Sequence, residues 1–102
     1  MDASEFFVKK ALDTTGQTPD LTDREKHLVG LAVTLTRGCQ FCTGRRIEDA
    51  LKAGISYGVV RSTIDLAAAV NAGVVLRTAI VGAQLNNIDE ICSGPECTIG
   101  ND

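Results

Sequence analysis

The chain has 102 residues, of which 44% are hydrophobic and only 4% aromatic, and it carries a net charge of −3 at pH 7. This length suits a single domain with a modest core, and oligomerisation would add to the apolar surface that it buries. The mild acidity, and the absence of any lysine or arginine run longer than a pair, argue against a nucleic-acid partner.

The N-terminal sequence and the interrupted apolar segments indicate a cytoplasmic protein that has no membrane partner. The first residues, Met-Asp-Ala-Ser-Glu-Phe-Phe, lack the basic start and apolar run of a secretory signal. The most apolar later region is broken by Asp65, Asn71 and Arg77. In a reducing cytoplasm, the four cysteines are expected to serve catalysis, redox chemistry or metal binding rather than structural cross-linking.

Helical periodicity predicts an all-α fold of about five helices, and no segment shows the sustained alternation of a strand. Ser4 is a candidate N-cap for a short docking helix that ends before a loop at residues 15–20. Thr22 and Glu25 have the spacing of a capping box. The apolar stripe that follows them predicts a second helix at about residues 23–37.

Glycine positions define the expected ends of the later helices. Gly38 is expected to end the second helix, and a third is expected at about residues 40–53, before Gly54. A fourth helix is expected at about residues 57–72, capped by the preceding serine, and a fifth at about residues 74–85.

The sequence Asn71-Ala-Gly73 is expected to separate the last two helices. The fifth helix is apolar nearly all round, so we expect it to be buried in the core or in a subunit interface. The segment after it is turn-rich and is expected to be poorly ordered. The single domain is thus expected to have three parts: a docking helix and loop at 1–20, core helices at 21–85 and a flexible cysteine-containing tail at 86–102.

Cys39 and Cys42 are three residues apart and follow Gly38, which places both thiols at the start of a helix. The free N–H groups and the dipole of a helix N-terminus stabilise a thiolate, which is the form that attacks peroxides and disulfides. Arg45 and Arg46 follow one turn later and add positive charge on the same face. The alternative is a pair of buried thiols that pack as small hydrophobic groups.

These motifs resemble those of a known superfamily. The elements are Gly38-Cys39-x-x-Cys42, a helix ending in Ala50-Leu-x-Ala-Gly-Ile-Ser56, an alanine-rich helix and an Asn-x-Gly break. Over residues 21–85 they resemble the carboxymuconolactone decarboxylase superfamily, especially its AhpD-like alkylhydroperoxidase branch. The resemblance implies an all-helical homo-oligomer, a trimer or hexamer, with thiol peroxidase (peroxiredoxin-type) or disulfide oxidoreductase activity.

The implied mechanism uses the dithiol itself and no separate cofactor. Cys42 attacks the O–O bond of a hydroperoxide and becomes a sulfenic acid, which Cys39 resolves to a disulfide. A protein dithiol then reduces the disulfide. A protein disulfide is the alternative substrate that the resemblance implies.

The chain departs from the family's proton relay, which uses a glutamate twelve residues before the first cysteine and a histidine four after the second. Those positions hold His27 and Arg46. Arg46 can stabilise the Cys42 thiolate, but a guanidinium stays protonated at neutral pH and cannot shuttle a proton. His27, the only histidine, is either a displaced acid–base group or a partly exposed residue without a catalytic role.

Three nearby acidic residues are candidates for the missing carboxylate, although they also suit a solvated charged face: Glu25, Glu48 and Asp49.

Cys92 and Cys97 leave three options open. They form a second disulfide that relays electrons, they join Cys39 and Cys42 in a four-thiolate zinc site, or they lie in a tail without chemistry.

Two further functions stay open beside the enzyme. Loss of the relay favours a non-catalytic redox-sensing or metal-binding oligomer on the same fold. A carboxymuconolactone decarboxylase-type lyase is the third option, although that branch does not depend on a Cys-x-x-Cys pair.

Overall fold

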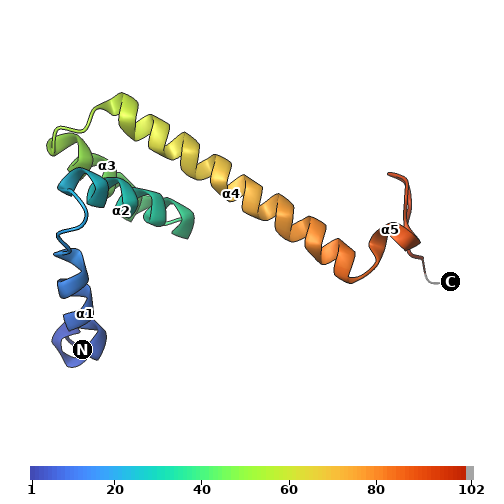
Figure 1. Cartoon of the computed structure of the whole chain (residues 1–102), viewed down its shortest axis with the longest axis horizontal. Coiled ribbons are helices and arrows are strands. Elements are labelled where there is room, and N and C mark those ends of the chain that lie inside the picture. The colour runs from blue at the N-terminus through green and yellow to red at the C-terminus, as the bar shows by residue number, and fades with distance from the viewer. Residues whose placement is uncertain (101–102) are drawn as a thin grey trace. The chain divides into compact units, whose positions relative to one another are not determined.

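The structure is a computed structural model that describes residues 1–100. Its elements, in chain order, are η1 (Ala3–Glu5), α1 (Phe7–Gly16), α2 (Asp23–Arg37), α3 (Gln40–Lys52), α4 (Tyr57–Leu85) and α5 (Ile88–Ile91) (Figure 1). Residues 1–100 contain no strand. The predicted all-α class with about five helices is therefore confirmed.

The N-terminal helix differs from the prediction at its start. Ser4 is not an N-cap, because its hydroxyl donates to Asp2 Oδ2 at 2.7 Å and the residue lies inside the short 3₁₀ turn η1. Asp2 caps that turn, and its N–H donates to Glu5 Oε2 at 2.9 Å. No residue of α1 is buried. Its role as a docking helix stays a prediction.

Helix α2 begins and ends where local capping requires. The Thr22 N–H donates to Glu25 Oε1 at 2.8 Å, and the Glu25 N–H donates to Thr22 Oγ1 at 3.1 Å, which confirms the predicted capping box. Gly38 ends the helix with φ 75°, a left-handed conformation that costs a glycine little and other residues more.

Helices α2 and α3 form an antiparallel hairpin that carries the core of the first unit (Figure 1). Four residues are buried there: Leu31, Ala50, Ile55 and Val60. Half-buried apolar side chains pack around them: Leu28, Leu35, Ile47, Val59 and Ile64. Leu31 is on α2, Ala50 on α3 and Val60 in the first turn of α4. This cluster therefore holds together the α2–α3 hairpin, which has the cysteines at its turn.

Helix α4 is continuous, so the predicted break at Asn71-Ala-Gly73 is wrong. The Ser56 hydroxyl accepts a hydrogen bond from the Val59 N–H at 3.2 Å, as expected for the cap of this helix. Asn71 and Gly73 each reduce helix stability by at most about 1 kcal/mol. That penalty does not end a cooperative helix that continues for several turns on both sides.

Only Val60 is buried in α4, so the predicted burial of its C-terminal half in a core is wrong for the single chain. The exposed large apolar side chains of this half are Val70, Val74, Val75, Leu76, Ile80, Val81 and Leu85. By length and composition, α4 could also cross a membrane, since its most apolar window has a mean hydropathy of 1.7. The chain divides into two compact units within this helix, Met1–Ala67 and Ala68–Asp102.

Candidate functional site

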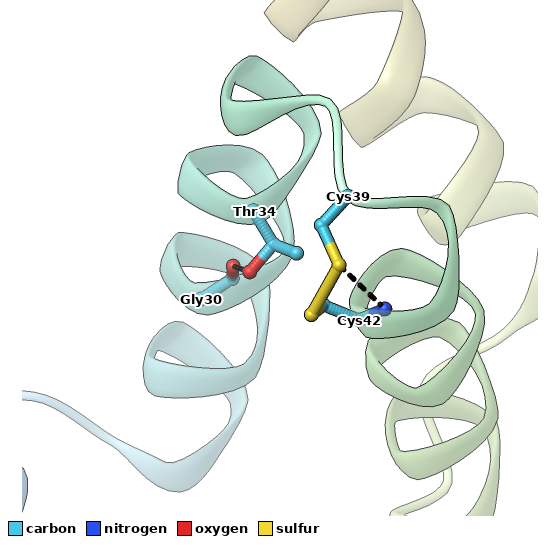
Figure 2. Close-up of a disulfide and its surroundings, with 4 residues drawn as sticks. All are labelled: Gly30, Thr34, Cys39 and Cys42. Carbon is cyan, nitrogen blue, oxygen red and sulfur yellow. Dashed lines mark hydrogen bonds between the residues drawn. A yellow bond between two sulfur atoms is a disulfide. The ribbon is translucent and has the colours of Figure 1, made fainter.

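Cys39 and Cys42 lie at the N-terminus of α3, where the structure joins them by a disulfide (Figure 2). Their Cα atoms are 5.3 Å apart. Cys39 is the N-cap residue, and its Sγ accepts a hydrogen bond from the Cys42 N–H at 3.2 Å. A sulfur atom therefore takes the place that a serine or aspartate oxygen usually has at this position.

The two cysteine residues differ in their exposure to solvent. Cys42 is exposed, whereas Cys39 is half-buried. An incoming peroxide or thiol can therefore approach Cys42 more easily than Cys39, which is already close enough to form the disulfide. This difference suits Cys42 as the sulfur that reacts with an external molecule and Cys39 as its resolving partner.

One face of α2 borders the disulfide. Thr34 points toward the space between α2 and α3 on the side of the cysteines (Figure 2), and its hydroxyl donates to the Gly30 carbonyl at 2.7 Å. Residues three or four apart share a helix face, so His27, Gly30 and Thr34 form one row along α2. The sequence had not identified Thr34 as part of the site.

Arg46 extends from α3 to this row. A Cβ built on Gly30 would lie 2.6 Å from Arg46 Nη1 and 2.9 Å from Cζ, so the guanidinium lies directly over the glycine. Only a residue without a side chain permits this approach. In the sequence, the only sign of this contact is Gly30 itself, because an isolated glycine within a helical pattern often marks a close approach by another group.

His27 lies one turn before Gly30 on the same face of α2 and is half-buried. Its side chain makes no hydrogen bond or ion pair with any residue in the range 1–100. The two positions that depart from the family relay, His27 and Arg46, thus both lie near Gly30 rather than beside the sulfurs. The row along α2 places His27 nearly two turns from Thr34, about 10 Å along the helix axis.

Two of the three acidic candidates for the missing carboxylate are bonded to other groups. The Thr22 backbone N–H, followed by the Thr22 hydroxyl, lowers the pKa of Glu25 from its ordinary value. Glu48 pairs with Lys52 at 2.7 Å, and the hydrogen bond from Lys52 lowers the pKa of the Glu48 carboxyl. Both carboxylates therefore favour the charged form through bonds unrelated to the cysteines. Asp49 is exposed on α3.

A shallow hollow of about 530 Å³ lies along the exposed face of α3 next to the cysteines. Its lining residues are Gln40, Phe41, Gly44, Arg45, Glu48, Asp49 and Lys52. Phe41 is 92% exposed and stands between the two cysteines in the sequence. The face beside Cys42 therefore offers an aromatic surface and a cation to an incoming molecule.

The structure also joins Cys92 to Cys97 by a disulfide, which agrees with one of the options left open by the sequence. Throughout residues 1–100, no three histidine, cysteine, aspartate or glutamate side chains gather closely enough to hold a metal ion.

Comparison with protein families matches residues 2–84 to the model described as the carboxymuconolactone decarboxylase family. Comparisons with curated proteins and with solved structures give no match. The matched range includes the Cys39–Cys42 disulfide and stops before the Cys92–Cys97 disulfide.

Proposed function

The chain belongs to the carboxymuconolactone decarboxylase family, and we propose that it is a thiol-dependent peroxidase or disulfide oxidoreductase of the AhpD-like branch. The observation that carries the proposal is the Cys39–Cys42 disulfide at the start of α3, with Cys42 exposed and Cys39 half-buried. Helix N-terminal N–H groups favour a thiolate over a neutral thiol.

The reaction begins with attack of the Cys42 thiolate on the outer oxygen of a hydroperoxide. The O–O bond breaks, an alkoxide leaves and takes up a proton, and Cys42 becomes a sulfenic acid. Cys39 then attacks the Cys42 sulfur and expels water, which forms the disulfide. A protein dithiol reduces this disulfide and is itself oxidised, so two electrons pass from the dithiol to the peroxide.

Arg46 and His27 influence this reaction electrostatically, from the face of α2 that leads to the disulfide. The guanidinium over Gly30 keeps a permanent positive charge on the face that leads to the disulfide, which favours the thiolate. His27 is the only imidazole of the chain, and from its place near Gly30 it adds a polar group to the face of α2 that leads to the disulfide. Neither residue is required for the formation of the disulfide from the sulfenic acid.

The proposal includes a cytoplasmic homo-oligomer, a trimer or hexamer, in which α4 provides the interface. Its apolar side chains are exposed in the single chain, and a hollow of about 710 Å³ runs along one face. Its lining includes Gly73 and Gly82 together with the apolar side chains of Val70, Val74, Val81 and Leu85. A helix from a second copy matches such a surface better than lipid does, because Arg77 also lines it.

A non-catalytic redox sensor is the second candidate, and the observation that favours it is the presence of His27 and Arg46 at the relay positions. A lyase of the decarboxylase type has no specific support in the geometry, because the dithiol would have no role in it.

Trapping the sulfenic acid tests the peroxidase. In Cys39→Ser, which lacks the resolving thiol, one equivalent of cumene hydroperoxide should allow dimedone to label Cys42. The matched variant Cys42→Ser should show no rapid labelling at Cys39. Equal, slow labelling of both variants would instead favour the sensor.

A further inference from the structure

The C-terminal segment at residues 86–100 contains a disulfide that the proposed peroxidase does not use. Cys92 directly follows α5, is half-buried, and its N–H donates to the Ile88 carbonyl at 2.8 Å. Cys97 is exposed, and its N–H donates to the Gly94 carbonyl at 3.0 Å. An external thiolate can therefore approach the exposed Cys97 more easily than the half-buried Cys92.

All the charged side chains of the segment that carries this disulfide, residues 86–100, are acidic. Residues 86–100 include Asp89, Glu90 and Glu96 and no lysine, arginine or histidine. Asp89 and Glu90 lie in α5 immediately before Cys92, Glu96 immediately precedes Cys97, and all three side chains are exposed. Such a cluster attracts a cationic reactant and repels an anionic one within about 10 Å at 0.1 M salt.

The Cys39–Cys42 disulfide has the opposite surroundings. Arg37 ends α2 just before it, and Arg45 follows it within the first two turns of α3, while the Arg46 guanidinium lies over Gly30 on α2. The free N–H groups of the helix add further positive potential there. The molecule therefore has two disulfides that each include an exposed cysteine, one flanked by arginines and one by acidic residues.

We propose that Cys92 and Cys97 form a second thiol–disulfide exchange site, which selects cationic dithiols such as a dithiol set in a basic protein surface. The inference goes beyond the proposed peroxidase and does not require it, since reduction of this pair needs only the external dithiol. Glutathione, which is anionic, would be a poor reductant for this site.

The exchange proceeds in two balanced steps. One thiolate of the reductant attacks Cys97 Sγ, the Cys97–Cys92 bond breaks, and the electron pair leaves on Cys92, which takes up a proton. The second thiolate of the reductant then attacks the reductant sulfur that is bonded to Cys97 in the mixed disulfide. This step closes the reductant's disulfide and releases Cys97 as a thiolate. The protein gains two electrons, and the reductant is oxidised to a disulfide.

Two small thiols of opposite charge provide the test on the full-length oxidised protein. Cysteamine is cationic and mercaptoethanesulfonate is anionic, and their rates of reduction are measured at each disulfide by quenching, alkylation and peptide mapping. The ratio of the cysteamine rate to the mercaptoethanesulfonate rate is the quantity of interest, because the two disulfides in one molecule serve as controls for each other.

We expect this ratio to be about tenfold higher at Cys92–Cys97 than at Cys39–Cys42 at low ionic strength, and to approach the same value in 1 M salt. Neutralising the cluster with Asp89→Asn, Glu90→Gln and Glu96→Gln should abolish most of the difference while both disulfides remain. In Cys92→Ser, the remaining thiol at Cys97 should form a mixed disulfide with oxidised cysteamine.

Two results would overturn the proposal. If Cys92–Cys97 resists both thiols while Cys39–Cys42 is reduced, the C-terminal disulfide is a structural cross-link. If the two disulfides show equal ratios, the acidic cluster does not select reductants. The double variant Cys39→Ser/Cys42→Ser, which has no peroxidase dithiol, should keep the selectivity, so failure of the peroxidase proposal would not affect this result.

Discussion

Adding a methyl group at Gly30 tests whether Arg46 lies over α2 as the structure has it. The new Cβ of Gly30→Ala would lie 2.6 Å from Arg46 Nη1, so the guanidinium must move by about 1 Å to restore van der Waals contact. The side chain is flexible and can move, but it loses its packing against α2.

Two opposing contributions decide the change in stability. Replacing a glycine in a helix interior by alanine stabilises the fold by about 0.5–1 kcal/mol. Displacing Arg46 offsets part of this gain, by about 0.5 kcal/mol, because the guanidinium loses its contact with α2 at Gly30. In the Arg46→Ala background nothing opposes the new methyl group, so Gly30→Ala should there give the full gain.

The assay is urea unfolding followed by circular dichroism at one fixed protein concentration, on the four proteins of the double-mutant cycle. We expect the stabilisation by Gly30→Ala to be about 0.5 kcal/mol smaller with Arg46 present than with Arg46→Ala. Equal stabilisation in both backgrounds would refute the contact, and with it the placement of the Arg46 charge between the two helices.

Three other predictions follow from the same structure. Leu31→Ala should destabilise the fold by about 3 kcal/mol, because Leu31 is fully buried in a small core, and thermal melting at fixed concentration would show this. The capping box with Thr22 lowers the pKa of Glu25 below its ordinary value of 4.5. The contribution of the ionised Glu25 carboxylate to the free energy of unfolding is therefore complete above pH 4.5 and is lost as the pH falls through the pKa of the folded protein. Below about pH 5, the denaturant midpoint of Glu25→Gln should therefore fall less steeply with decreasing pH than that of the unsubstituted protein. An equal pH dependence of the two midpoints would show that Glu25 ionisation is not linked to stability. Leu76→Glu on α4 should reduce the mass in light scattering toward that of one chain, whereas Leu12→Glu on α1, at a similarly exposed apolar position, should not; equal effects would argue against an α4 interface.

The hairpin of α2 and α3 could be predicted from the sequence because its boundaries depend on neighbouring residues. Thr22 and Glu25 satisfy the first N–H groups of α2 between themselves, and Gly38 provides the left-handed residue that ends it. Such signals act within one turn of the helix and leave a direct pattern in the sequence.

The continuity of α4 could not be predicted in the same way. Asn71 and Gly73 are weak helix formers, but the cooperativity of a 29-residue helix exceeds their local cost. A pattern rule that weighs a few residues at a time therefore finds a boundary where the chain has none.

The position of Arg46 also depended on tertiary structure. Its spacing from Cys42 suggested a charge beside the sulfur, whereas its side chain instead reaches across to Gly30 on α2. Spacing along a helix gives the face on which a residue lies, but a long side chain can take any of several directions from that face. The partners of Cys92 and Cys97 were similarly undecided, because their spacing permits a disulfide, a metal site or neither.

The most direct test of the central claim is a time course of mass spectrometry on the fully reduced protein after one equivalent of hydroperoxide, with peptide mapping of any new bond. The account predicts rapid loss of two hydrogens at Cys39 and Cys42 together, with Cys92 and Cys97 oxidised more slowly. Slow and unselective oxidation of all four cysteines would contradict a peroxidase at the start of α3.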